Sequence, residues 1–192
     1  MIVLVRHGAT EWSTARRHTG RTDIPLTEHG RAQASALAPL LSGLRPDRVL
    51  SSPLARARET CELAGFGAHV ELDDRLLEWD YGEAEGRTTA EIREQDPAWS
   101  VWTHPIAGAE PLVSVADRVD SLIAELRPFG DDGVVVLFAH AHLLRILGAR
   151  WCDLPAAAGQ NLVLDPASVS ILGMEREAPC IERWNVVPAP FG

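Results

Sequence analysis

Basic side chains stand at three places in the sequence where a predicted strand ends. Arg6 and His7 follow one apolar strand, Arg56 lies on the first turn of the helix after a second, and His140 follows a third. The carboxyl ends of neighbouring parallel strands open on one crevice, which is where ligands bind in open α/β sheets. Two arginines, two histidines and helix N-termini at one spot would hold an anion the size of a phosphate group.

Arginine supplies all 18 residues of the lysine-plus-arginine total, because the sequence contains no lysine. This composition excludes Schiff-base and pyridoxal phosphate chemistry, a P-loop and a kinase-type nucleotide site, since each of these requires a lysine. Any bound anion must therefore be held by arginine, histidine, hydroxyl groups or backbone N–H groups.

Charge and hydrophobic pattern limit the partners. A formal net charge of -9 argues against nucleic acid or an anionic membrane, because most of the surface would repel their phosphates. The apolar run at residues 2–5 is too short for a signal peptide, and no run approaches a membrane span. Cys61, Cys152 and Cys180 are odd in number and far apart, without disulfide or metal-ligand spacing. We therefore expect a cytoplasmic protein with no metal and no cofactor.

The elements that must position these side chains follow from hydrophobic runs, caps and breakers. Thr27 is expected to cap one helix, and Ser52 followed by Pro53 is expected to begin another. The segment 76–110 is expected to be irregular and partly helical. The expected strands cover residues 2–5, 48–51, 69–72, 134–138, 161–164, 169–174 and 181–187, and the expected helices cover 27–43, 52–64, 114–126 and a segment after 140. This alternation predicts a single α/β domain over residues 1–192 with a mostly parallel sheet.

Five blocks of the sequence resemble the histidine phosphatase superfamily, also called phosphoglycerate mutase-like. Residues 5–10 (VRHGAT) match its R-H-G-x-T signature, and residues 51–60 (SSPLARARET) are similar to its S-S-x-L-x-R-A-x-x-T block. Residues 19–27, 77–86 and 138–140 follow in the family's order, so the resemblance covers nearly the whole chain. It implies one histidine phosphatase domain, built as a three-layer sandwich with helices on both faces of the central sheet.

The resemblance also implies roles for individual residues. His7 would attack phosphorus and form a phosphohistidine, and Glu78 would protonate the leaving alcohol and then activate water. As a donor, Glu78 needs a raised pKa, which burial and the adjacent phosphate would supply. The other groups expected around the phosphoryl oxygens are Arg6, Ser13, Thr19, Gly20, Arg56, His140 and the backbone N–H of Ala141.

Several nearby residues admit two interpretations. His142 is either a partner of a site residue or simply the start of a helix, and Trp79 and Tyr81 either line the pocket or pack in the core. The spacing of Trp99 and Trp102 favours a packed helical face over a substrate lid. The remaining polar candidates are expected at the surface: His18, which lies in a loop near the site, together with His29, His69, His104, Glu83 and Glu85.

Two positions depart from the family pattern. Ala141 stands where many members have glycine, and a positive φ there would cost an alanine about 1 kcal/mol. Pro111 replaces a residue that is usually serine and so lacks both a hydroxyl and an N–H group. Neither change removes a reacting group, but both bear on the shape of the pocket.

The choice within the family is between hydrolysis and transfer. Cofactor-dependent mutases are typically longer and carry lysine for a phosphoglycerate carboxylate, so this short chain without lysine resembles a phosphatase more closely. Residues 78–82, 99–102 and 138–145 resemble the sedoheptulose-bisphosphatase-like and actinobacterial acid phosphatase branch. We expect a small phosphorylated substrate, such as a sugar phosphate. A mutase and a catalytically silent regulatory protein are the alternatives, and the oligomeric state, with a homodimer as one option, stays open.

Overall fold

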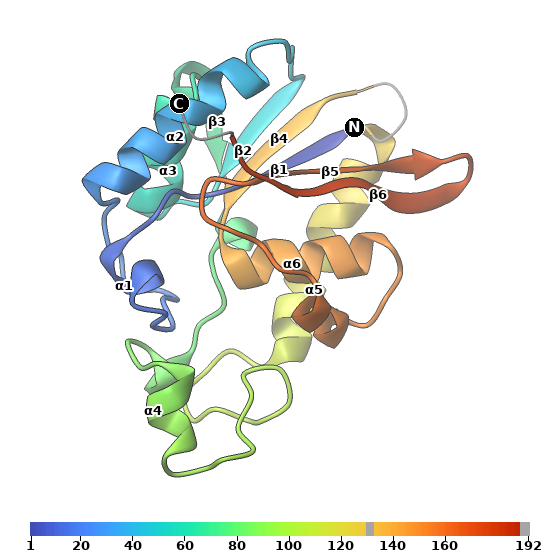
Figure 1. Cartoon of the computed structure of the whole chain (residues 1–192). Coiled ribbons are helices and arrows are strands. Elements are labelled where there is room, and N and C mark those ends of the chain that lie inside the picture. Colours follow the sequence, from blue (N-terminus) through green and yellow to red (C-terminus); the bar gives the residue numbers. More distant parts are fainter. Residues whose placement is uncertain (130–132, 189–192) are drawn as a thin grey trace.

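A six-stranded sheet forms the centre of the computed structural model, which describes residues 1–129 and 133–188 (Figure 1). The strands are β1 (Ile2–Arg6), β2 (Arg48–Ser51), β3 (Val70–Leu72), β4 (Val135–Ala139), β5 (Val169–Glu175) and β6 (Ala178–Val186). Their order is β3-β2-β4-β1-β5-β6. The first four are parallel to one another, and β5 and β6 are antiparallel to their neighbours. The predicted mostly parallel α/β sheet is confirmed.

Two pairs of helices cover the two faces of the sheet (Figure 1). One pair is α2 (Glu28–Leu41) and α3 (Ala55–Leu63), and the other is α5 (Leu112–Leu126) and α6 (Ala141–Trp151). The short helices are α1 (Glu11–Thr14) and α4 (Thr89–Arg93), and 3₁₀ turns cover Gly67–His69, Asp74–Leu76, Gly82–Ala84, Arg127–Phe129 and Ala156–Asn161. This arrangement is the expected three-layer sandwich.

The alternation of side chains along β1 explains why the sheet needs two covering layers. Ile2 and Leu4 pack in the core beneath α5 and α6, whereas Val3 and Val5 pack in a second core beneath α2 and α3. All four are at most 1% exposed. Successive strand residues point to opposite faces, so a strand that is apolar throughout is buried on both sides.

Two details of the predicted elements are wrong. The helix expected from Ser52 begins at Ala55, because the Ser52 hydroxyl binds His140 and Leu54 occupies the N-cap position without a side-chain bond. The strand expected at residues 161–164 is absent: the backbone carbonyls of Val163 and Leu164 accept hydrogen bonds from side chains instead of a neighbouring strand. By contrast, Thr27 caps α2 as expected, accepting a bond from the Gly30 N–H at 3.0 Å.

The segment between β3 and α5 projects beyond the sheet on the side where the parallel strands end, and it carries α4 (Figure 1). It is irregular with short helical turns, as predicted, and it buries Ile92, Trp99 and Val101 in the core. Among residues 1–129 and 133–188, no helix has the length and apolar character needed to cross a bilayer.

Candidate active site

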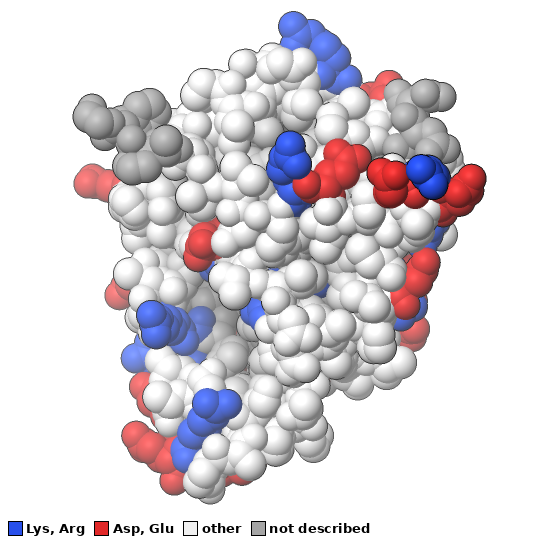
Figure 2. Space-filling view, turned by 45° about the vertical axis from the view of Figure 1, so that its right-hand side comes forward, with Lys and Arg blue, Asp and Glu red and all other residues white. Residues whose placement is uncertain are grey.

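A cavity of about 460 Å³ opens where β1 and β4 end. His7 follows β1, Ala141 and His142 begin the helix after β4, and all three line the cavity. Figure 2 shows a hollow on this face of the molecule with basic residues along its edge. The lining residues are Arg6, His7, Ser13, Arg16, Arg17, His18, Thr19, Glu78, Tyr81, Thr89, Arg93, Trp99, Ser100, Val101, Trp102, Ala141, His142, Arg145 and Leu164.

His7 is held as a neutral imidazole with one nitrogen free to react. Its Nδ1 lies 2.7 Å from the carbonyl oxygen of Gly8. A carbonyl can only accept, so Nδ1 carries the proton and Nε2 keeps its lone pair. Burial, together with the positive charges of Arg56 and Arg6, lowers the pKa of His7 well below its usual value. The ring therefore stays neutral in mildly acidic solution, with Nε2 unprotonated.

Close contacts with neighbouring elements anchor the loop that carries His7. The Gly8 N–H donates to the Thr60 hydroxyl of α3 at 3.1 Å. A Cβ on Gly8 would lie 2.3 Å from the Gly30 carbonyl oxygen, so only glycine allows the start of α2 to approach this closely. The backbone at the end of β1 is thus fixed by both helices of that face.

Arg6 presents an unused donor. One terminal N–H of its guanidinium donates to the Leu164 carbonyl oxygen. Its Nε is buried and has no hydrogen-bond partner within the part of the chain that the structure describes. Burial lowers the pKa of Arg6 to about 10, which leaves the group charged at neutral pH. A buried cationic donor without an acceptor, in the wall of a cavity, suits an anionic ligand.

Arg56 and His140 lie behind the cavity and are not part of its lining. The Arg56 side chain is fully buried and donates from Nε to His140 Nδ1 at 3.1 Å. Its terminal nitrogens donate to the carbonyl oxygens of Thr22 and Gly20, both at 2.9 Å. Because His140 Nδ1 accepts, its Nε2 donates to the Ser52 hydroxyl at 2.8 Å. Burial and the Arg56 charge lower the pKa of His140 well below normal.

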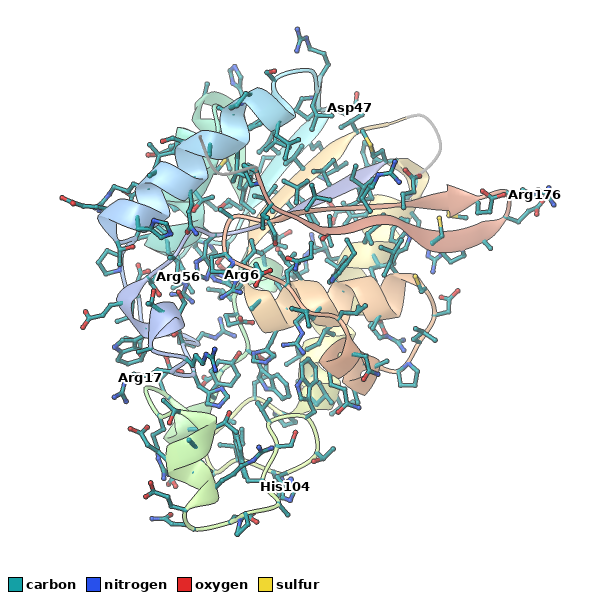
Figure 3. All side chains as sticks on the ribbon, viewed as in Figure 1. Arg6, Arg17, Asp47, Arg56, His104 and Arg176 are labelled. Atoms are coloured by element: carbon teal, nitrogen blue, oxygen red, sulfur yellow. The ribbon has the colours of Figure 1, made fainter. Side chains whose placement is uncertain are left out.

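His7 and His140 are near neighbours all the same, with ring centroids 5.2 Å apart. Figure 3 shows Arg6 and Arg56 on the same side of the sheet, near the ends of the parallel strands. The structure therefore brings the four predicted basic residues together at one edge of the sheet. Arg6 and His7 line the cavity, whereas Arg56 and His140 do not.

The three expected polar contacts from the loop after β1 have different surroundings. Ser13 and Thr19 line the cavity. The Ser13 hydroxyl accepts from the Thr10 N–H and donates to the Thr10 carbonyl, and the Thr19 hydroxyl donates to the Arg17 carbonyl. Gly20 does not line the cavity, and a Cβ there would lie 2.4 Å from the Trp79 carbonyl oxygen. Gly20 is thus a close-packing position.

Glu78 is buried and lines the cavity at the start of α6. Its Oε1 accepts from the N–H groups of Trp79 at 3.0 Å and Leu143 at 2.9 Å, and its Oε2 accepts from the His142 N–H at 3.0 Å. Two of these donors are N–H groups of the first turn of α6, which have no acceptor within the helix. Arg118 donates to the Leu77 carbonyl at 2.7 Å and holds the preceding backbone.

The two departures from the family pattern fit this backbone. Ala141 is the first residue of α6 and is not one of the described non-glycine residues with positive φ, so alanine carries no left-handed penalty there. As the first helical residue, its N–H has no acceptor within the helix and is available to a ligand. Pro111 is the N-cap residue of α5 with φ of -61°, and it does not line the cavity.

A sequence model described as "Histidine phosphatase superfamily (branch 1)" matches residues 2–187 of the chain. The chain belongs to the histidine phosphatase superfamily. Over 176 residues it is 42% identical to an acid phosphatase of Mycobacterium tuberculosis, covering 91% of this chain and 86% of that one. This match confirms the resemblance to the superfamily and supports a phosphoric monoester hydrolase.

Solved structures of this superfamily have the same fold. The product of an open reading frame of Mycobacterium tuberculosis superposes with a TM-score of 0.92 at 38% identity, covering 98% of both chains. A mycobacterial glucosyl-3-phosphoglycerate phosphatase superposes with a TM-score of 0.85 at 34% identity, covering 96% of this chain and 98% of that one.

Aromatic rings form the wall of this histidine phosphatase cavity next to Glu78. The expectation that His18 lies at the surface is wrong: it is 9% exposed and contacts the rings of Tyr81 and Trp99. The Tyr81 hydroxyl is hydrogen-bonded to His142 Nδ1, so His142 both begins a helix and contacts a cavity residue. Burial raises the pKa of Tyr81 well above normal and lowers that of His142, which keeps both groups neutral.

The tryptophans divide between core and cavity. Trp99 is 6% exposed and packs in the core, as predicted, yet both it and Trp102 also line the cavity. These two residues lie in consecutive turns, so they do not share the expected helical face. Trp79 is a core residue that does not line the cavity, and its ring packs against Trp102 at 5.8 Å between centroids.

The expectation for Glu85 is also wrong, whereas Glu83 is exposed as predicted. The Glu85 carboxylate accepts from the Gly20 N–H at 2.9 Å and the Thr22 N–H at 3.1 Å. The carbonyl oxygens of the same two residues bind Arg56. Glu85 thus holds the loop that holds Arg56, a role that an acidic surface pattern does not reveal.

Sequence reasoning missed four arginines of the cavity wall: Arg16, Arg17, Arg93 and Arg145. A signal existed for the first two, since Arg16, Arg17 and His18 are consecutive in the loop between the first two family blocks. Arg145 ends the segment 138–145 that resembles one branch of the family, whereas nothing in the pattern around Arg93 distinguishes it from a surface residue. Among the described residues, no group of three or more His, Cys, Asp and Glu side chains is placed to hold a metal ion.

Proposed function

We propose that this histidine phosphatase hydrolyses small phosphomonoesters, sugar phosphates among them, through a phosphohistidine at His7. The observation that carries the proposal is the bond between His7 Nδ1 and the Gly8 carbonyl, which leaves Nε2 unprotonated. The unpaired Nε of Arg6 in the same cavity supplies a donor for a phosphoryl oxygen. The relative named as a phosphatase of a sugar-containing phosphate supports the substrate class.

In the first half-reaction, His7 Nε2 attacks phosphorus and the bond from phosphorus to the ester oxygen breaks. A protonated Glu78 gives its proton to the departing alkoxide, which leaves as an alcohol. Arg6 and the Ala141 N–H bind the phosphoryl oxygens, where negative charge accumulates in the transition state. Arg56 does not line the cavity and acts through its charge: together with burial, the positive charge of Arg56 lowers the pKa of His7.

In the second half-reaction, the Glu78 carboxylate takes a proton from water as the water oxygen attacks phosphorus. The bond between phosphorus and His7 breaks, inorganic phosphate leaves, and Glu78 is again protonated. The three backbone donors to Glu78 hold its carboxylate in one position for both steps. Tyr81 and Trp102 line the same cavity as His7 and Glu78, and we expect the leaving group and the water to pass along their rings.

The test measures phosphate release from a panel of phosphomonoesters by the wild type, His7→Ala and Glu78→Gln. We expect His7→Ala to abolish turnover and to remove an acid-labile phosphoenzyme trapped by rapid quenching. Glu78→Gln should lower kcat by about 10²–10⁴-fold on alkyl phosphates. It should lower the phosphorylation rate much less on p-nitrophenyl phosphate, whose leaving group needs no proton. His29→Ala, at an exposed histidine, is the control.

Full activity of His7→Ala would refute the proposal. The pH dependence is a second test, because His7 must be neutral while Glu78 is protonated. Since the pKa of His7 is held well below normal, activity should be higher below neutral pH than above it. A rate that climbs steadily from pH 5 to 9 contradicts Glu78 as the acid.

A mutase activity is the second candidate, and the arginines of the cavity wall favour it more than the sequence does. Arg17 and Arg93 could hold a phosphoglycerate carboxylate without any lysine. The distinguishing assay follows the exchange between 2- and 3-phosphoglycerate together with phosphate release. Exchange without release would establish the mutase, whereas release without exchange supports the phosphatase.

A further inference from the structure

The cavity wall carries far more positive than negative charge. Of the described residues, five arginines line it, whereas Glu78 is the single carboxylate there. This contrasts with the whole chain, whose formal net charge is -9. Clustered cations repel one another in a partly enclosed site, so their grouping implies a compensating anion. One phosphoryl group beside Arg6 accounts for only part of this charge.

Arg145 is committed to the protein itself. Its guanidinium lies 4.8 Å from the centre of the Trp102 ring and donates to the carbonyl oxygens of Gly159 at 2.9 Å and Gln160 at 3.0 Å. These contacts hold Trp102 and the 3₁₀ turn Ala156–Asn161 in place.

Arg16, Arg17 and Arg93 are less committed. Arg93 donates from Nε to the Trp99 carbonyl at 2.8 Å, and its terminal nitrogens make no bond to the described residues. Arg17 donates to the Gly86 carbonyl at 2.6 Å and lies 3.5 Å from Glu91, with 39% of its side chain exposed. The Arg16 side chain has no hydrogen bond or ion pair within residues 1–129 and 133–188, and its backbone adopts φ of 56°.

These three arginines come from two elements that meet at the same wall. A β-bridge joins Arg17 to Thr88, the residue that caps α4, and Arg93 ends α4. Figure 3 shows Arg17 between α1 and α4, away from Arg6 and Arg56. The basic groups therefore fall into two sets, one beside His7 and one at the junction of α1 and α4.

We infer that Arg16, Arg17 and Arg93 form a subsite for a second anionic group of the substrate, a carboxylate or a second phosphate. The inference rests on the proposed function and names its substrate class: a phosphomonoester whose leaving group carries another anion. The leaving group spans the cavity along the aromatic wall of His18, Tyr81 and Trp102. A cavity of about 460 Å³ has room for both anions and the carbon skeleton between them.

The experiment compares aryl phosphates that share one leaving group. The probes are 4-(carboxymethyl)phenyl phosphate, its neutral N-methyl amide and 4-(phosphonomethyl)phenyl phosphate. We expect kcat/KM to be about tenfold higher for an anionic probe than for the amide, the effect of one partly exposed charge-assisted contact. Whichever anionic probe is preferred identifies the second group as carboxylate or phosphate.

The double variant Arg17→Gln/Arg93→Gln should reduce this preference to between one- and twofold. Because the preference is a ratio within one variant, a general loss of activity cancels. Arg176→Gln, in the exposed turn between β5 and β6 and far from Arg6 and Arg17 in Figure 3, should keep the wild-type ratio. The preference should also shrink as NaCl rises from 50 to 500 mM.

Equal kcat/KM for the amide and both anionic probes in the wild type would overturn the inference, and so would an undiminished ratio in the double variant. Either result leaves the proposed function standing, since the amide is still hydrolysed. Failure of the proposed function has a different signature: none of the three probes releases phosphate, and no phosphoenzyme is trapped.

Discussion

Thr60 links the loop that carries His7 to α3, and replacing it should lower both the stability and the rate. Its side chain is fully buried. The hydroxyl accepts from the Gly8 N–H at 3.1 Å and donates to the Arg56 carbonyl at 2.7 Å. Valine has nearly the same shape but can do neither. Thr60→Val therefore removes two buried hydrogen bonds without opening a cavity.

The magnitude follows from the donor that is left behind. A buried N–H without an acceptor costs about 1–3 kcal/mol, and a lost neutral bond contributes about 1 kcal/mol. The sum predicts a free energy of unfolding about 2–4 kcal/mol lower for Thr60→Val. In a chain of this length that corresponds to a Tm about 4–16 °C lower. Thr60→Ser keeps the hydroxyl and loses one methyl group, so it should cost only about 1 kcal/mol.

The assay is urea unfolding of the wild type and both variants, followed by fluorescence with a shared m-value as the check of two-state behaviour. The same variants are tested for kcat, because Gly8 also supplies the carbonyl that orients His7. Thr60→Val should be slower than Thr60→Ser. If Thr60→Val is as stable as Thr60→Ser, the Gly8 contact contributes nothing and the reasoning is wrong.

Two other perturbations test the electrostatics of the fold. Burial lowers the pKa of His18 to about 4, so between pH 6.5 and that value the unfolded chain binds a proton that the folded chain refuses. The free energy of unfolding therefore falls as the pH drops. His18→Gln should reduce this fall between pH 7 and 5 by up to about 2 kcal/mol, whereas the control His29→Gln should leave it unchanged. If chemical denaturation gives the same pH dependence for the wild type and His18→Gln, the reasoning is wrong. Glu125 bridges Arg48 and Arg75, at 2.5 and 2.6 Å, and is partly exposed, so Glu125→Gln should cost about 1 kcal/mol at pH 7. That difference should shrink in 1 M NaCl, and an unchanged difference would mean that the network acts through packing instead of charge.

The buried histidines of the site change the stability in the same direction as the pH falls. His7, His140 and His142 are buried with lowered pKa values, so each also favours unfolding when the pH falls below its unfolded value. The same burial keeps His7 neutral in mild acid. The activity that we propose below neutral pH and the expected loss of stability in acid therefore have a common physical origin in this cavity.

Much of the site could be predicted because its signals are local. Arg6 and His7 directly follow a strand that is apolar on both faces, and His140 directly follows another. Parallel strands bring their carboxyl ends to one edge, so position in the chain sufficed to place these side chains together. The cap at Thr27 was equally readable, because a cap involves only its own first turn.

The errors concern residues whose surroundings come from distant segments. His18 and Glu85 are polar and lie in loops, and only the packing of the segment after β3 against the loop after α1 buries the first and gives the second its N–H partners. Residues 161–164 have an apolar pattern suited to a strand, but the side chains of Arg6 and Trp184 donate hydrogen bonds to backbone carbonyl oxygens of this segment. No local pattern contains these partners.

The sequence by itself determined the alternation of strands and helices, the strand ends that carry Arg6, His7 and His140, and the exclusion of lysine chemistry. Only the tertiary structure decided which basic residues face the cavity. It buried Arg56 against His140, outside the cavity lining, and brought Arg17 and Arg93 to one wall. The hydrophobic pattern of a strand or helix depends on residues that are close in the sequence. The electrostatic field within a cavity depends instead on charges from segments that meet only when the chain has folded.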